Sequence, residues 1–178
     1  MIKITKLTVD DVRFPTSKDL IGSDAIHTDP DYSATYVTIH TSDNNLKGFG
    51  IAFTIGKGND IVAECIKHYF PLIEDLSIDE VEKNIGSLWY NFADHSQLRW
   101  LGPEKGVVHM ALAAVFNALW DIIAKKNQKP LWQFVVESKP ETIMSWLTFK
   151  YIEDVMSKDD AFKILNDNQI FYKERVNK

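Results

Sequence analysis

The feature that most constrains this chain is an apolar run at residues 107–124. Only three residues in the run fall outside the hydrophobic set, namely His109, Asn117 and Asp121. Together with Ala113 they recur every four residues, and steps of four stay on one side of a helix. We therefore predict a single helix that is buried almost all round and carries one polar seam.

The run is about as long as a membrane-spanning helix, roughly 20 residues. Asp121 inside it and Lys125 and Lys126 after it favour the core of a soluble protein, so no membrane partner is expected. Pro130 then allows a short helical segment to begin at Leu131 and to end near residue 136.

Three segments before the run have the composition of β-strands: residues 2–14, 33–41 and 47–54. They are rich in β-branched and aromatic residues, and the third places Phe49, Ile51 and Phe53 at a period of two. Turn-forming residues separate the last two segments, so we predict a three-stranded antiparallel meander. The loop at residues 16–32 is long and polar, and such loops in compact domains are often functional.

A second loop, TIGKGND, contains Gly56 and Gly58 and follows the third strand. Two helices are expected after it. Asn59 or Asp60 is the predicted cap of a first helix, whose buried face carries Ile61, Cys65 and Tyr69. A capping box, Ser at the cap and Glu three residues later, begins a second helix at residues 77–80. That helix should run to about residue 94, with a buried stripe at Val81, Ile85, Leu88, Trp89 and Phe92.

The end of the chain changes pattern after residue 136. Residues 143–151 alternate, with Ile143 and Leu147 on one face, and predict another strand. Ser157 and Asp160 then begin a last helical segment. The fold class predicted from these elements is α+β.

Composition excludes several classes of protein. The chain has 178 residues, 45% of them hydrophobic and 25% charged, which suffices for one sizeable core. The net charge of −5 weighs against a nucleic-acid partner. Cys65 is the single cysteine, which excludes a disulfide framework and a thiolate metal cluster. The N-terminus resembles neither a secretory signal nor a transit peptide, so a cytoplasmic location is expected.

Motifs of known chemistry are weak in this sequence. The five histidines form no metal-binding pair, and His109 is predicted to be a hydrogen-bonded core residue. The glycines at positions 56 and 58 flank Lys57 before a helix, but a plain turn is favoured over a phosphate site. The residues alone therefore indicate a soluble α+β domain with two polar loops, and they identify no reaction.

The order of the elements resembles the N-terminal capping domain of the enolase superfamily, mandelate racemase subgroup. Two segments resemble its specificity loops, namely VRFPTSKDLIGSDAIHTDPDYSATYV and GFGIAFTIGKGND. Its central helix and its entry into the barrel resemble GPEKGVVHMALAAVFNALWDIIAKK and LTFKYIEDVMSKDDAFKIL. Within the subgroup, the chain is most similar to the L-fuconate dehydratases.

This resemblance implies a Mg²⁺-dependent acid-sugar dehydratase. Such enzymes remove the proton α to a carboxylate and expel the β-hydroxyl, which yields a 2-keto-3-deoxy sugar acid. The metal ligands and the acid–base residues lie on strands of a barrel of about 250 residues. We therefore expect a capping domain at residues 1–137 and only the first strand and helix of a barrel at residues 138–178. No catalytic residue or metal ligand is assigned, and the chain alone is expected to be inactive.

The resemblance further implies which residues face a sugar acid. The candidate substrate-binding residues come from the two loops and from the end of the first barrel strand: Gly22, Ser23, Asp24, Asp29, Tyr32, Thr54, Ile55, Gly56, Lys150 and Tyr151. Two other hypotheses stay open. The chain could be a truncated paralogue that acts as a binding or homo-oligomerisation module through the exposed strand edge at 143–151. It could also be a stand-alone binder of small ligands.

Overall fold

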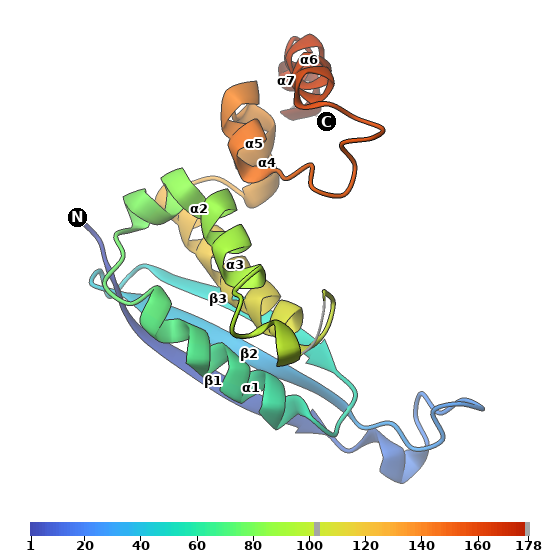
Figure 1. Ribbon diagram of the computed structural model, residues 1–178. Coiled ribbons are helices and arrows are strands. Elements are labelled where there is room, and N and C mark those ends of the chain that lie inside the picture. Colours follow the sequence, from blue (N-terminus) through green and yellow to red (C-terminus); the bar gives the residue numbers. More distant parts are fainter. Residues whose placement is uncertain (102–103, 177–178) are drawn as a thin grey trace.

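The computed structural model describes residues 1–101 and 104–176. Its sheet has three antiparallel strands in the order β1-β2-β3: β1 is Ile4–Phe14, β2 is Tyr32–Thr41 and β3 is Lys47–Thr54 (Figure 1). In the register, Val9 lies opposite Val37, and Val37 lies opposite Gly50. The predicted meander is therefore confirmed, and the bounds of β3 match the prediction.

Two helices cover one face of the sheet, α1 (Asn59–Tyr69) and α3 (Val107–Lys126), and α2 (Ile78–Ala93) packs on α3 (Figure 1). The apolar helix α3 lies directly on β3, where Gly48 and Gly50 allow the backbones to approach closely. A Cβ atom at Gly50 would lie 1.9 Å from the carbonyl oxygen of Ala114. Residues without a side chain are therefore required on this face of β3.

The polar seam of α3 is confirmed and has a structural role. Asp121 Oδ2 accepts a hydrogen bond from the backbone N–H of Phe49 at 2.9 Å, and Lys125 Nζ donates to the carbonyl oxygen of Lys47, also at 2.9 Å. These backbone groups belong to the outer edge of β3. The seam therefore occupies one end of a strand edge that would otherwise be free to pair.

Within the described residues, α3 is the one helix long and apolar enough to cross a membrane. Of its most apolar 18-residue window, 61% is buried inside the fold. Its apolar character is thus explained by its central position, because a core helix passes the same test of length and composition.

The start of α1 differs from the prediction. Its N-cap is Gly58, in the left-handed conformation, and no side chain caps the helix. The buried face carries Val62, Ala63, Ile66 and Tyr69, whereas Ile61 is exposed. The predicted cap at Asn59 or Asp60 is therefore wrong, and so is Ile61 as part of the buried face. Tyr69 is confirmed on that face, and Cys65 is partly buried against the core.

The capping box of α2 is confirmed. Ser77 Oγ accepts a hydrogen bond from the N–H of Glu80 at 3.2 Å, and Glu80 Oε2 accepts one from the N–H of Ser77 at 3.0 Å. The helix ends at Ala93 with Asp94 as its C-cap. Short 3-10 turns lie at Thr16–Asp19, Phe70–Leu72 and Arg99–Leu101.

After α3, the described chain forms helices that are joined by turns. They are α4 (Leu131–Glu137), α5 (Pro140–Trp146), α6 (Lys158–Gln169) and α7 (Tyr172–Val176), which lie beyond α2 and α3, away from the sheet (Figure 1). The short helix expected after Pro130 is confirmed. So is the helix begun by Ser157, whose Oγ accepts from the N–H of Asp160 at 3.1 Å.

The strand predicted at residues 143–151 is wrong. Pro140 occupies the first turn of α5, where its missing N–H costs nothing, and the helix continues to Trp146. A barrel strand needs a neighbour on each side to pair its backbone groups, and the described residues place no strand beside this segment. Residues 138–176 therefore contain helices and turns where a strand followed by a helix was expected.

Candidate functional site

The two polar loops meet beyond one end of the sheet. The first comprises residues 15–31, between β1 and β2, and the second comprises residues 55–58, between β3 and α1. Together they form a cleft of about 310 Å³. Its lining comes from both loops: Ser17, Ile26, His27, Asp29, Pro30, Asp31, Ile55, Gly56 and Lys57.

The base of the first loop is closed by hydrogen bonds between its two ends. Asp31 Oδ1 accepts from the N–H of Ser17 at 3.1 Å and from its hydroxyl at 2.5 Å. These two bonds to Ser17 lower the pKa of the Asp31 carboxyl. Thr16 Oγ1 donates to the carbonyl oxygen of Pro30 at 3.0 Å and accepts from the N–H of Tyr32 at 3.1 Å. The loop is long, yet its ends are held together.

Asp24 shapes the tip of the first loop. Its Oδ1 accepts from the backbone N–H groups of His27 at 2.7 Å and Ile26 at 2.8 Å, which lowers the pKa of the carboxyl. This is the Asx-turn geometry that aspartate favours in loops. Ser23, beside it, is exposed. Both residues therefore lie in the turn at the tip of the loop, and neither lines the cleft.

The second loop is held by Asn59, which sequence reasoning treated only as a cap. This residue is fully buried. Its Oδ1 accepts from the hydroxyls of Thr35 at 2.8 Å and Thr54 at 2.6 Å, and its Nδ2 donates to Asp11 Oδ1 at 2.5 Å. Bonds from Arg13 and then Asn59 lower the pKa of Asp11. A polar residue directly after a Gly-x-Gly turn was the available signal for this role.

The same network fixes the backbone of the second loop. The Thr54 proton is donated to Asn59, so the 2.6 Å contact between Ser33 and Thr54 has Ser33 as the donor. Ser33 Oγ accepts in turn from the N–H of Gly56 at 2.7 Å. Gly56 has φ of +99°, and a Cβ atom there would lie 3.1 Å from Asp31 Cβ. Thr54 therefore supports the loop, while Gly56 brings the two loops into contact.

Tyr32 and Gly22 brace the first loop against the sheet. The Tyr32 ring lies 5.8 Å from that of Phe53, measured between centroids. Gly22 has φ of +80°, and a Cβ atom there would lie 2.2 Å from the Tyr32 hydroxyl. This close approach explains why glycine occupies the position.

Of the ten candidate residues, Asp29, Ile55 and Gly56 line the cleft. Six further lining residues were not among the candidates: Ser17, Ile26, His27, Pro30, Asp31 and Lys57. Their position inside the two polar loops was the only available signal. His27 and Lys57 place basic groups at a cleft whose apolar wall comes from Ile26 and Ile55.

Lys150 and Tyr151 do not line the cleft between the two loops. Lys150 Nζ pairs with Asp94 Oδ2 at 3.0 Å, and the Tyr151 hydroxyl contacts Glu104. The expected position at the end of a barrel strand is not found, because the strand itself is absent from the described residues. Both residues instead line a separate cavity of about 210 Å³.

His109 lines this separate cavity as well. Its ring packs edge-on against Trp89 at 6.0 Å between centroids, and its buried Nδ1 has no hydrogen-bond partner among the described residues. The hydrogen bond predicted for this core histidine is therefore not found at Nδ1.

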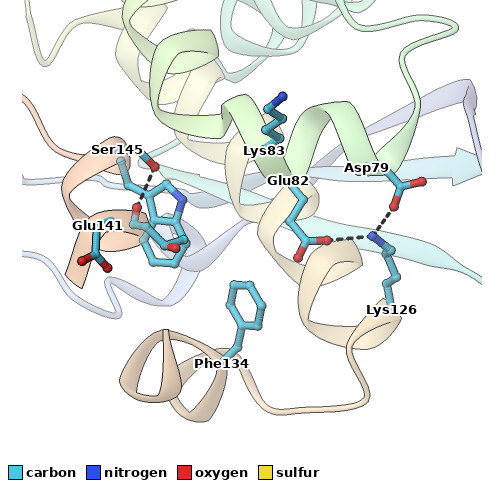
Figure 2. Close-up of a pocket in the computed structure, with 9 residues that line it drawn as sticks. Asp79, Glu82, Lys83, Lys126, Phe134, Glu141 and Ser145 are labelled. Carbon is cyan, nitrogen blue, oxygen red and sulfur yellow. Dashed lines mark hydrogen bonds and ion pairs between the residues drawn. The ribbon is translucent and has the colours of Figure 1, made fainter. Parts of the chain in front are cut away.

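A larger cavity, about 540 Å³, lies where α2 and α3 meet α4 and α5 (Figure 2). Lys126 Nζ pairs there with Asp79 at 2.5 Å and with Glu82 at 2.8 Å. The bond from Lys126 lowers the pKa of Asp79. These two ion pairs tie α2 to the end of α3. No residue of the two loops contributes to this cavity.

Magnesium does not fit the residues that the structure describes. No group of three or more His, Cys, Asp or Glu side chains among residues 1–101 and 104–176 is arranged to hold a metal ion. The carboxylates of the first loop are already engaged, Asp31 with Ser17 and Asp24 with backbone amides. The described part of the chain thus supplies no magnesium site.

A family model described as the mandelate racemase / muconate lactonizing enzyme, N-terminal domain, matches residues 22–135. The chain belongs to this family. The match covers residues 22–31 of the first loop, all of the second loop and α3, and it confirms the predicted place in the enolase superfamily, mandelate racemase subgroup. The α+β capping-domain fold of this family is confirmed as well.

Relatives in the family are substantially longer than this chain. Mitochondrial enolase superfamily member 1 of Bos taurus is 45% identical over 174 residues, which span 97% of this chain and 39% of the relative. The crystal structure of the human protein of that name matches with a TM-score of 0.91 at 44% identity, over 98% of this chain and 40% of that one.

Two further family members carry names with a chemical meaning. L-galactonate dehydratase of Hypocrea jecorina is 41% identical over 175 residues, 98% of this chain and 39% of the relative. A racemase from Streptomyces coelicolor A3(2), solved with bound magnesium, matches with a TM-score of 0.60 at 26% identity, over 77% of this chain and 36% of that one. The chain thus spans about 39% of the length of these curated relatives.

Proposed function

We propose that this chain supplies the capping domain of an acid-sugar dehydratase. One observation carries the proposal: 41% identity to an L-galactonate dehydratase extends over 98% of the chain, including both loops. The cleft between the loops supports it, because Lys57 lies there beside Asp29 and Asp31, so both a cation for the carboxylate and acceptors for the hydroxyls of a sugar acid line the same surface. Closure of these loops as a lid excludes water from the substrate.

The reaction we propose for the complete enzyme converts a sugar acid into a 2-keto-3-deoxy acid and water. The proton leaves the carbon α to the carboxylate, and the hydroxyl leaves the β-carbon. None of these steps is assigned to a residue of this chain. Magnesium is proposed at the level of the family, supported by the magnesium-bound racemase, with its ligands outside the described residues.

For the substrate we propose L-fuconate rather than L-galactonate. The two acids differ at carbon 6, where L-fuconate has a methyl group and L-galactonate a hydroxymethyl group. Ile26 and Ile55 line the cleft and are 85% and 48% exposed in this chain, and we propose that closure of the loops over the complete enzyme buries them against carbon 6. A methyl group suits these apolar side chains, whereas a hydroxyl group would lose hydrogen bonds to water without gaining a partner there.

The test is a chimera in which this chain replaces the matching N-terminal part of the Hypocrea jecorina L-galactonate dehydratase. We expect the chimera to dehydrate a sugar acid in the presence of Mg²⁺, and the 178-residue chain alone to give no turnover. Formation of the 2-keto-3-deoxy acid is measured directly. A folded chimera without activity on either acid, or turnover by the chain alone, would contradict the proposal.

The substrate assignment has its own test in an active chimera. Ile55→Thr should lower kcat/KM for L-fuconate about tenfold and narrow the preference over L-galactonate, because one apolar contact is lost. Ile61→Thr is the matched control, since Ile61 is equally apolar, exposed on α1 and outside the cleft. Equal effects of the two substitutions would remove the assignment while leaving the dehydratase proposal intact.

Two accompanying proposals concern location and ligands. We propose a cytoplasmic location; the word mitochondrial belongs to the printed names of the animal relatives. Fractionation of source cells with an antibody against the chain decides between these compartments. Binding of sugar acids by the chain alone is testable as a rise in melting temperature.

Oligomerisation through residues 143–151 is no longer supported. That hypothesis depended on a free strand edge, and Pro140–Trp146 forms helix α5 instead.

A further inference from the structure

No helix or strand of the described residues covers the face of the sheet turned away from α1–α3 (Figure 1). This face carries large apolar side chains, and the Lys125 amine reaches it, 4.3 Å from the centroid of the Phe49 ring. On β3, Phe49, Ile51 and Phe53 alternate with the small residues that face α3, and they are 55%, 43% and 61% exposed. Tyr36 lies opposite Ile51 on β2, and Phe14 ends β1 on the same face. We call these five residues the outer patch.

The size of the outer patch is unusual for a free surface. Five side chains that are each about half exposed present roughly 500 Å² of mostly apolar area. Apolar patches of about 300–600 Å² are the largest on typical monomers and are often functional. A stable interface buries about 800 Å² on each partner, so the patch together with its polar surroundings is large enough to form one.

The edge of β3 is occupied at one end only. There Asp121 accepts from the N–H of Phe49 and Lys125 donates to the carbonyl oxygen of Lys47. The apolar side chains of the outer patch project from the face of the sheet, so the face is the surface that their burial would use.

The two ends of the outer face carry opposite charge. At one end the register places Lys6, His40 and Lys47 side by side. Burial, and then the two lysines, lower the pKa of His40, so the positive charge at this end comes from the lysines. Beyond the other end lie the two loops, whose aspartates outnumber their lysines, Lys18 and Lys57, by four to two: Asp19, Asp24, Asp29 and Asp31.

These two ends are at equal distance from the middle of the patch. Lys47 lies four residues before Ile51 along the chain. Ile55, which belongs to the second loop, lies four residues after Ile51. At about 3.3 Å per residue, each step is about 13 Å. Two copies stacked face to face with opposite strand directions would therefore bring each basic end to the other copy's acidic loop. Stacking with the strands of the two copies running in the same direction would place the lysines of one copy against those of the other.

We propose that the outer patch binds a second copy of this chain, face to face and with strands running in opposite directions. The patch supplies the apolar centre of an isologous interface, and the lysine end and the acidic loop supply its charged rim. The complementary charges select the antiparallel arrangement, because like charges would otherwise face each other.

Sedimentation velocity of the whole chain is the first test. We expect a dimer at about 100 µM, a concentration at which an interface of standard size is occupied. Ile51→Lys should weaken the dimer at least about 30-fold, because it places a charge at the centre of the patch. Ile61→Lys, on exposed α1, is the matched control and should leave the dimer unchanged. A monomeric wild type, or equal effects of the two variants, would overturn the proposal.

Charge reversal tests the direction of stacking. The double variants K6E/K47E and D19K/D29K should each be mostly monomeric, because each homodimer would oppose like charges. Mixed in equal amounts, they should form a heterodimer, since both contacts then pair opposite charges. A dimer that neither double variant weakens, or a mixture that stays monomeric, would show that a different surface or a different partner covers the patch.

Asp10 provides a finer test of the register. It lies opposite Tyr36 on β1, level with Ile51, so the stack brings the Asp10 carboxylates of the two copies toward each other. Asp10→Asn should therefore tighten the dimer about threefold. A weaker dimer would contradict the proposed arrangement.

Discussion

The sheet with α1–α3 and the helices α4–α7 are built by different means. In the first region the core is continuous, and α3 alone buries eleven residues. In the second region α4 and α7 bury no residue fully, and α6 buries only Ala161. Apolar side chains such as Val155, Ile170 and Phe171 remain exposed there.

This contrast shows where the stability of the chain resides. Burial of apolar area is the main favourable term in folding, so the first region has a core of its own. The second region has little buried area and should open locally at a lower free energy than global unfolding. Trp146 is the main link between them, and its ring lies 5.0 Å from that of Trp120 on α3.

The largest expected effect on the free energy of unfolding comes from substituting a glycine that is in close contact with a helix of either region. A Cβ atom at Gly50 would lie 1.9 Å from a backbone oxygen of α3, and one at Gly86 would lie 2.4 Å from the carbonyl oxygen of Ser145 on α5. Gly50→Ala should lower the free energy of unfolding by at least about 3 kcal/mol, because α3 cannot move away. Gly86→Ala should release α5 and leave the main transition in urea nearly unchanged. Equal losses would mean that α5 belongs to the same core.

A deletion of side-chain volume sharpens the same comparison. Leu119→Ala, at a fully buried position of α3, should cost about 3 kcal/mol, the transfer and cavity terms combined. Leu131→Ala, at a position of α4 that is 39% exposed, should cost less than about 1 kcal/mol. Both values are measured by denaturant unfolding. A large cost at Leu131 would place α4 in the core.

Tyr69 predicts an alkaline limit for the first region. Burial raises the pKa of its hydroxyl from about 10 to about 12, because the folded state favours the neutral form. Its contribution to stability is therefore complete below pH 10 and lost as the pH rises toward 12. Tyr69→Phe should cost about 1 kcal/mol at neutral pH, since the hydrogen bond to the Phe92 carbonyl disappears, and should reduce the alkaline loss. An unchanged alkaline slope would show that other groups cause it.

The smallest expected effect concerns the loop that borders the cleft. The bonds from Ser17 depress the pKa of Asp31 below its ordinary value of 3.8. The anchoring of the loop should therefore be intact above that pH and fade as the pH falls through the lower, folded value. The Ser17 amide shift in NMR should titrate with a midpoint below 3.8 in the wild type and lose this step in Asp31→Asn. A midpoint at or above 3.8 would contradict the hydrogen bonds at the loop base.

The first region was predictable from sequence to a large extent, and the reasons are local. The meander follows from period-two alternation in segments with clear turns, and α3 follows from one uninterrupted apolar run. The role of Asn59 was missed because its three side-chain partners lie on β1, β2 and β3, far from it in sequence or across a turn. Only the assembled sheet brings them together.

The second region was predicted less well because its pattern is ambiguous. Residues 143–147 alternate as a strand would, yet Pro140 can equally begin a helix, and short apolar segments do not separate the two states. Pairing partners decide between them, and those partners are not on this part of the chain. The expected site at Lys150 and Tyr151 depended on the strand, so it failed with it.

Hydrogen–deuterium exchange of the intact chain tests the division of the molecule most directly. We expect the amides of β2 and α3 to exchange only through global unfolding, and those of α4, α6 and α7 to exchange at a free energy several kcal/mol lower. Uniform protection from Ile4 to Val176, with one common unfolding free energy, would contradict the account.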